Sequence, residues 1–141
     1  MRHLILIRHG ESELNARNRE QRVFCGQVDT PLTPRGREQA RQAAEHLRKL
    51  DFVQPRLAIS SPLSRAAETL QIVLEHYGPP PSKVLAGRGI ERLPPAPAFV
   101  ERSHGLFEGK TEDEAYGEHP AYRDDPELAG FMDHFHRHAP G

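Results

Sequence analysis

Two short apolar runs and two amphipathic stretches alternate along the first half of the chain. Residues 3–7 form one apolar run, and residues 56–60 form the other. A short apolar run that is buried on both faces is typical of a central strand in a parallel sheet. We therefore expect strands over both runs, and a third strand over residues 83–85.

Helix signals follow each of the two runs. Thr33 is a good N-cap and Pro34 suits a first helical turn, so we expect a helix to begin there. Ser61 and Pro62 open a second helix, which Gly78 ends. The residues expected on the buried sides of these helices are Ala40, Ala43, Ala44, Leu47, Leu63, Ala66, Ala67, Leu70, Val73 and Leu74.

The last third of the chain carries two more helix signals. Thr111 and Glu114 match a capping box, so a short helix should begin there and stop before Pro120. Asp125 and Pro126 begin another helix, because apolar residues follow them at helical spacing. These apolar residues are Leu128, Phe131, Met132 and Phe135.

The alternation of strands and helices predicts an α/β fold with three layers, in which helices cover both faces of a mostly parallel sheet. The length of 141 residues suits one domain over residues 1–141. Ligands bind at the carboxyl ends of the strands in such sheets. His9 and its neighbours lie at one such end, and Ser60, Ser61 and Arg65 follow the other.

Composition removes several classes of function. The chain has 19 basic and 20 acidic residues, so bulk attraction to nucleic acid or to an acidic membrane is not expected. A single cysteine, Cys25, excludes a disulfide framework within the chain and suits the cytoplasm. No apolar run approaches the roughly 20 residues that cross a bilayer. The N-terminal run is also too short for a signal peptide.

His9 is the first candidate for chemistry. Neutral imidazole is a competent nucleophile toward phosphorus. Arg8 disfavours the imidazolium and can grip a phosphate through its planar fork of donors. Gly10 lets the backbone approach a ligand closely. The alternative is a histidine that caps a strand and meets water, and an isolated His-Gly pair would favour that alternative.

The longer segment around His9 favours the catalytic interpretation over the strand-capping one. Residues 6–15 read Leu-Ile-Arg-His-Gly-Glu-Ser-Glu-Leu-Asn, which resembles the signature of the histidine phosphatase (phosphoglycerate mutase-like) superfamily. The resemblance implies that His9 becomes phosphorylated, that Arg8 and Asn15 bind the phosphate, and that Ser12 assists. It implies a phosphoglycerate mutase-like fold, and we expect neither a metal nor another cofactor.

Two further segments agree with this resemblance in order. Residues 26–33 resemble the family's loop into its first long helix, and residues 60–69 resemble its second signature. The second signature implies that Arg65 is another phosphate-clamping arginine, at a helix N-terminus that also favours an anion. The alternative is a surface arginine that pairs with Glu68 at i+3.

The last matching segment is residues 101–109, which supplies the candidate acid. The resemblance implies that Glu101 protonates the leaving oxygen, a contribution of about 10²–10⁴-fold in rate. The alternative is that Glu101 pairs with Arg102 on a loop. Glu91 competes for the acid role, and Glu108 is expected to cap or brace its loop.

The chain departs from the family in one respect. The family has a second catalytic histidine on a late strand that ends in His-Gly, and no such segment exists before Gly141. We expect the fold to lack its C-terminal strand and helix portion, which leaves the first strand with an open edge. The chain could be a fragment, a short protein that retains phosphate binding, or one whose gap is filled by a partner or a second copy. His104 could substitute in part.

The sequence therefore predicts a phosphomonoester hydrolase that forms a phosphohistidine on His9 and is impaired by loss of the second histidine. Its substrate would be a small phosphorylated metabolite, with specificity set by residues 78–97 and by the segment after Gly109. Glu108 and Gly109 resemble the phosphatase pattern more than the mutase one. Mutase-type phosphoryl transfer and a non-catalytic phosphate-binding module remain the alternatives.

Overall fold

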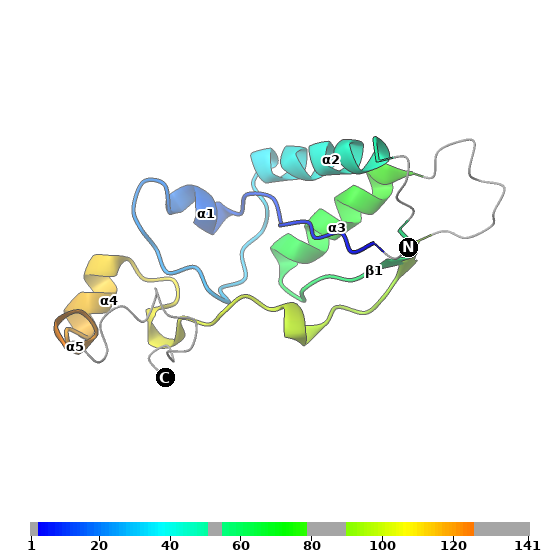
Figure 1. Ribbon diagram of the computed structural model, residues 1–141. Helices are drawn as coiled ribbons and strands as arrows, with labels where there is room; N and C mark the ends of the chain where they lie inside the picture. The colour runs from blue at the N-terminus through cyan, green and yellow to red at the C-terminus, as the bar shows by residue number, and fades with distance from the viewer. Residues whose placement is uncertain (1–2, 51–54, 79–89, 126–141) are drawn as a thin grey trace. The chain divides into compact units, whose positions relative to one another are not determined.

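The computed structural model describes residues 3–50, 55–78 and 90–125 (Figure 1). The chain divides into two compact units. The first unit contains Met1–Glu13 and Asp29–Val100, and the second contains Leu14–Val28 and Glu101–Gly141. Each unit has its own buried apolar cluster and is described by itself.

Two long helices form the frame of the first unit. The helix α2 (Pro34–Arg48) begins where the sequence predicts, because the Thr33 hydroxyl accepts a hydrogen bond from the Gly36 amide at 3.0 Å. The helix α3 (Ser64–Tyr77) starts slightly later than predicted. It ends at Gly78, whose φ of 46° favours glycine. The two helices lie side by side (Figure 1).

Apolar side chains pack together between these two helices. One buried cluster joins Ala44 and Leu47 of α2 to Val73 and Tyr77 of α3, with Ile5 packed against it. A second cluster contains Leu32, Ala40 and Ile72.

The predicted spacing of apolar residues is confirmed for Ala40, Ala44 and Leu47 of α2. On α3 only Val73 of the predicted residues is fully buried, and the buried face also contains Arg65, Thr69, Ile72 and Tyr77. The prediction for α3 missed this face because it followed apolar residues alone, whereas polar side chains of the candidate site are buried there.

The described sheet is small and parallel. Strand β1 (Leu57–Ala58) pairs with β2 (Glu91–Arg92), so Leu57 lies opposite Glu91. The strand predicted over 56–60 is confirmed at its centre, whereas the one predicted over 83–85 lies outside the described residues. Strand β2 was not predicted, since both of its side chains are polar and exposed and it has no apolar run.

The expectation of a central strand over residues 3–7 is wrong for the described structure. These residues are assigned to no strand, and the side chains of Leu4 and Leu6 are 85% and 82% exposed. Ile5, which points to the other side, packs on the helix cluster. Only one face of this segment is therefore covered by described residues. Leu57 of β1 and Ile59 beside it are also exposed.

The second unit is built from short elements. Up to residue 125, where the described part ends, these are α1 (Glu13–Arg17), the 3₁₀ turn η3 (Gly105–Phe107), α4 (Glu112–Glu118) and α5 (Ala121–Asp124). The described part of the first unit contains the 3₁₀ turn η2 (Pro97–Phe99). The capping box predicted for Thr111 and Glu114 is confirmed, and α4 ends before Pro120 as expected. The helix predicted from Asp125 onward falls outside the described residues.

Aromatic rings form the core of the second unit. Phe24, Phe107 and Ala115 are buried together, and Tyr116 and Tyr122 pack against them. The rings of Phe24 and Phe107 are 5.1 Å apart between centroids. An antiparallel bridge between Val23 and Thr111 ties the early segment of this unit to the late one.

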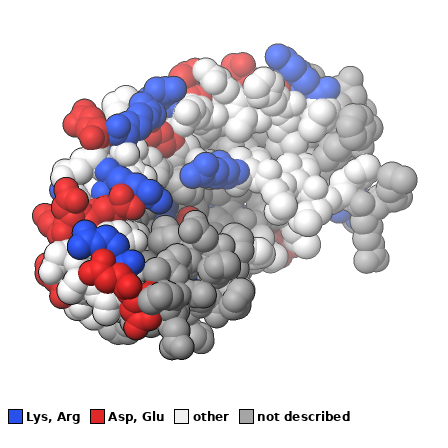
Figure 2. All heavy atoms as spheres, turned by 60° about the vertical axis from the view of Figure 1, so that its left-hand side comes forward, with Lys and Arg blue, Asp and Glu red and all other residues white. Residues whose placement is uncertain are grey.

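The surface charge and the character of the helices are relevant to binding of nucleic acid and of membranes. On the face drawn in Figure 2, acidic and basic side chains are interspersed, in keeping with the net charge of -1. Recognition of an anion on that face would depend on individual residues rather than on a broad basic area. Among the described residues, no helix has the length and apolar character that crossing a membrane requires.

Candidate active site

His9 contacts a second predicted site residue directly. Its Nε2 lies 3.2 Å from the Nε of Arg65, and its Nδ1 lies 2.7 Å from the carbonyl oxygen of Gly10. The carbonyl can only accept a hydrogen bond, and the arginine N–H can only donate one. The imidazole must therefore carry its proton on Nδ1, which leaves the Nε2 lone pair facing the guanidinium.

Arg65 is placed by the start of α3. It occupies the first helical turn, and only 4% of its surface is exposed. The alternative partner, Glu68, forms an ion pair with Arg37 of α2 at 2.6 Å. A buried arginine beside a histidine can bind an anion that both groups reach, since its planar fork matches phosphate oxygens.

Asp29 caps the helix that carries Arg65, which the sequence reasoning missed. Leu63 at the N-cap position has no side-chain capping bond. The Asp29 carboxylate instead accepts hydrogen bonds from the Ser64 amide and hydroxyl, both at 2.7 Å. The start of α3 therefore already faces a negative charge. The sequence feature that could have pointed to Asp29 is its place in segment 26–33, which resembles a family loop. This segment precedes the helix by about thirty residues.

The turn after His9 docks on the start of α2. The Glu11 amide donates to the Gln39 side-chain oxygen at 2.8 Å, and the Thr33 hydroxyl donates to the Glu11 carboxylate at 2.8 Å. Gly10 and Gly36 meet with no room for a side chain between them. These contacts hold the His9 turn from the side of α2.

The other predicted site residues, three phosphate ligands and the catalytic acid, are distributed over both units. Arg8 is exposed in the first unit, and Ser12 is buried there with its backbone bridged to Leu32. Asn15 lies on α1 and Glu101 on an exposed loop, both in the second unit. The structure thus brings His9 and Arg65 into contact, and the catalytic and phosphate-binding roles of all six residues stay predictions.

Glu108 braces the loop around Gly105, as the sequence predicts. Its Oε1 accepts hydrogen bonds from the Gln27 amide at 3.0 Å and from the His104 amide at 2.9 Å. Burial acts to raise the pKa of Glu108, but these hydrogen bonds outweigh it and the pKa is lowered. Gly26 has a φ of 45° and leaves space for this carboxylate. Glu108 is therefore ionised at neutral pH and structural in this unit.

His104 is held in a partly buried position beside Glu108. Burial lowers the pKa of His104, and the nearby Arg102 lowers it further, against the opposing charges of Glu108 and Glu101. Its ring meets the edge of Phe24 at 5.8 Å between centroids. Among the described residues its Nδ1 is buried without a hydrogen-bond partner. His104 is thus neutral at pH 7.

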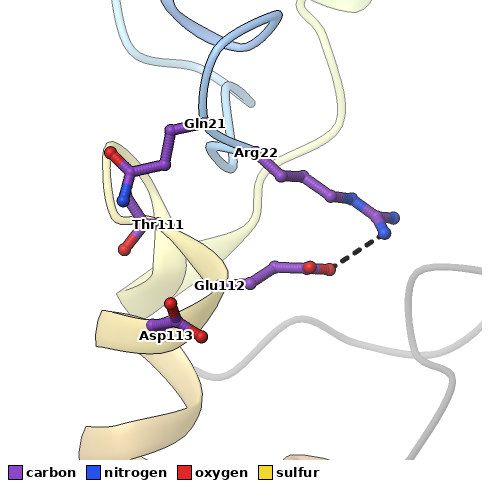
Figure 3. A pocket seen from close by; sticks show the side chains of 5 residues that line it. All are labelled: Gln21, Arg22, Thr111, Glu112 and Asp113. Atoms are coloured by element: carbon purple, nitrogen blue, oxygen red, sulfur yellow. Dashed lines mark ion pairs between the residues drawn. The ribbon is translucent and has the colours of Figure 1, made fainter.

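A shallow hollow lies elsewhere in the second unit (Figure 3). It is lined by Gln21, Arg22, Thr111, Glu112 and Asp113. Two of these residues, Arg22 and Glu112, form an ion pair at 3.0 Å, in which the arginine is largely exposed and the glutamate is partly exposed. None of the predicted catalytic or phosphate-binding residues lines this hollow, so it does not compete with His9 as the candidate site.

Comparison with known proteins identifies the family of the chain. The sequence model of the Histidine phosphatase superfamily (branch 1) matches residues 4–136. This match includes all six residues singled out for catalysis and phosphate binding. It therefore covers both the segment that carries His9 and the helix that carries Arg65.

The relatives include mutases and phosphatases. The chain is 36% identical over 112 residues to a 2,3-bisphosphoglycerate-dependent phosphoglycerate mutase of Parvibaculum lavamentivorans, covering 79% of this chain and 47% of that protein. It is 45% identical over 82 residues to a glucosyl-3-phosphoglycerate phosphatase of Mycolicibacterium vanbaalenii, covering 58% of this chain and 33% of the relative.

A solved structure of a phosphatase resembles this chain in fold. The native structure of a mycobacterial glucosyl-3-phosphoglycerate phosphatase superposes with a TM-score of 0.60 at 30% identity, covering 82% of this chain and 45% of that one. The α/β fold of this chain is therefore that of the phosphoglycerate mutase-like histidine phosphatases. The chain spans about half the length, or less, of these relatives.

Proposed function

Because the chain belongs to the histidine phosphatase superfamily (branch 1), we propose that it hydrolyses small phosphate monoesters through a phosphohistidine on His9. The observation that carries the proposal is the contact between His9 Nε2 and the buried guanidinium of Arg65 at 3.2 Å. It pairs a nucleophile with a cation that can bind the group under attack.

The proposed first step forms the phosphoenzyme. The lone pair on His9 Nε2 attacks phosphorus, and the bond from phosphorus to the ester oxygen breaks. The leaving oxygen takes a proton from Glu101, as the family resemblance implies. Arg65 exchanges its hydrogen bond to Nε2 for hydrogen bonds to the phosphate oxygens, so that it neutralises charge while the nitrogen becomes free to react.

The proposed second step releases phosphate. Water attacks the phosphorus of phospho-His9, the nitrogen–phosphorus bond breaks, and the water proton passes to the Glu101 carboxylate. The proton stays on His9 Nδ1, hydrogen-bonded to the Gly10 carbonyl, so the ring regains its starting tautomer with the lone pair on Nε2. The residues expected to bind the phosphate with Arg65 are Arg8, Ser12 and Asn15.

Mutase-type transfer is the second candidate, because a phosphoglycerate mutase matches over 79% of this chain. Both activities would use the same phosphohistidine, and they differ in whether water or a second substrate hydroxyl accepts the phosphoryl group. The Glu108-Gly109 pair favours the phosphatase. The names of the relatives direct the substrate search to small phosphorylated metabolites, including phosphoglycerate derivatives.

Hydrolysis of p-nitrophenyl phosphate by the wild-type chain and by His9→Ala tests the proposal. We expect turnover by the wild type, loss of at least 10²-fold in His9→Ala, and acid-labile phosphate on His9 after quenching. His46→Ala is the matched control, since His46 is exposed in the last turn of α2. Equal turnover by wild type and His9→Ala contradicts the mechanism.

Two other outcomes separate the alternatives. Conversion of 3-phosphoglycerate to 2-phosphoglycerate, with little free phosphate released, would favour the mutase. Binding of inorganic phosphate that needs His9 and Arg65, without any turnover, would instead identify a phosphate-binding module.

A further inference from the structure

Thr69 links the two parts of the candidate site. It lies one helical turn after Arg65 on α3, and only 4% of its surface is exposed. Its hydroxyl accepts a hydrogen bond from the Gly10 amide at 3.1 Å and donates one to the Arg65 carbonyl at 2.7 Å. One buried hydroxyl thus connects the turn that carries His9 with the helix that carries Arg65.

The direction of these two hydrogen bonds is determined by their partners. The Arg65 carbonyl can only accept, so the hydroxyl proton must point to it. This back-bonding to the residue four positions earlier is a known arrangement of threonine in helices. The oxygen lone pair is consequently left for the Gly10 amide, which can only donate. Valine has the same shape but could form neither bond.

The amide that Thr69 holds belongs to the peptide bond between His9 and Gly10. The carbonyl of the same Gly10 accepts a hydrogen bond from His9 Nδ1. On the other side, Gly10 is in direct contact with the backbone of Gly36 at the start of α2. The peptide after His9 is therefore held by a hydroxyl from α3 and by close packing against α2.

We propose that Thr69 is a positioning residue that keeps the Nε2 lone pair of His9 aligned with the Arg65 guanidinium. The proposal rests on the proposed phosphohistidine function. Thr69 contacts neither the reacting nitrogen nor the arginine fork, and it acts by orienting the His9–Gly10 peptide. Misplacement of a reacting group by about 1 Å can cost 10²-fold in rate.

Substitution by valine and by serine separates the hydroxyl from the shape of the side chain. With p-nitrophenyl phosphate, we expect kcat of Thr69→Val to fall about 10²-fold per folded molecule, with KM changed only a few-fold. Thr69→Ser keeps the hydroxyl and should recover kcat to within several-fold. Equal losses in both variants, or an unchanged kcat in Thr69→Val, would overturn the proposal.

Thr111→Val is the matched control for loss of a buried threonine hydroxyl. Thr111 is 3% exposed and caps α4 in the second unit. We expect this variant to lose stability while kcat per folded molecule stays close to the wild-type value. If Thr69→Val fails to fold, Thr69→Cys replaces it, because a thiol has similar size and is a weaker hydrogen-bonding group.

An NMR measurement separates this proposal from the proposed function. In Thr69→Val the imidazole nitrogen shifts of His9 should move toward a tautomer mixture, and the Gly10 amide should exchange faster with solvent. Thr69→Ser should restore both signals. This readout is decisive even if the wild type shows no turnover, which by itself would count against the hydrolase. Unchanged His9 and Gly10 signals in Thr69→Val would refute the positioning role.

Discussion

Gly10 and Gly36 are in backbone contact, so that a side-chain carbon on Gly10 would lie 2.1 Å from the Gly36 carbonyl oxygen. The contact brings the turn that carries His9 against the first turn of α2. A side-chain carbon on Gly36 would in the same way lie 2.1 Å from the Glu11 carbonyl oxygen. Such a distance is far below ordinary van der Waals contact, and the obstacle is backbone that cannot rotate away.

Replacement of Gly36 by alanine should therefore disturb the His9 turn. We expect Gly36→Ala to lower both the melting temperature and the turnover of p-nitrophenyl phosphate, the latter by about 10²-fold. Gly117→Ala is the control, because a side chain there meets no atom within 4 Å. Within helix α4 this control should be neutral or stabilising by about 0.5–1 kcal/mol. Wild-type turnover in Gly36→Ala would show that the turn tolerates displacement.

The shape of the Arg65 guanidinium should matter as much as its charge. Arg65→Lys keeps a cation but removes the Nε donor that contacts His9 and the planar fork. We expect kcat/KM for an aryl phosphate to fall about 10²–10³-fold. The exposed Arg41→Lys, in an i,i+3 pair with Glu38, is the comparison and should change little. Full activity in Arg65→Lys would remove Arg65 from the proposed phosphate site.

Glu108 should make the stability of the protein depend on pH. Its pKa is lowered in the folded state, so the unfolded state binds its proton at a higher pH. The stabilisation is complete above the unfolded-state pKa, and it is lost as the pH falls through the lower, folded-state value. The melting temperature of Glu108→Gln should therefore lie below that of the wild type at pH 7. The two values should converge in strong acid, and a constant difference across that range would contradict this assignment.

The two faces of the N-terminal segment should respond differently to substitution. Ile5 packs against the α2–α3 cluster, so Ile5→Ala should lower the free energy of unfolding by about 1–2 kcal/mol. Leu6 is 82% exposed, so Leu6→Lys should change that free energy by less than about 0.5 kcal/mol. We also expect Leu6→Lys to reduce self-association, because it places a charge on an exposed apolar edge segment. Denaturant unfolding and light scattering measure the two effects. A large loss of stability in Leu6→Lys would mean that its side chain is covered.

Local capping signals predicted the starts of α2 and α4, whereas α3 begins later than predicted and the short helices α1 and α5 were not predicted. Thr33 with Pro34, and Thr111 with Glu114, have capping chemistry that acts within one turn, and both pairs begin helices where expected. The sheet was predicted less well. Strand β2 consists of two exposed polar residues, and its pairing with β1 depends on a partner more than thirty residues away. Nothing in its local pattern reports that pairing.

The candidate site shows the same division. Residues 6–15 and 60–69 are sufficient to name His9 and Arg65, because their chemistry and order match a known signature. Neither segment says which nitrogen of His9 faces the arginine, or that Asp29 caps α3. The tautomer depends on contacts of both ring nitrogens, one with the neighbouring carbonyl and one with a residue 56 positions away.

The linear order of residues was enough to establish the superfamily, the starts of α2 and α4 and the identity of the nucleophile candidate, since these depend on short motifs. Tertiary structure alone decided that residues 3–7 are covered on one face within the described structure, and that Thr69 bridges Gly10 and Arg65. The physical reason is that burial and hydrogen-bond partners depend on which distant segments pack together. An apolar run indicates only which side chains would gain free energy from burial. Tertiary packing determines whether another segment covers them.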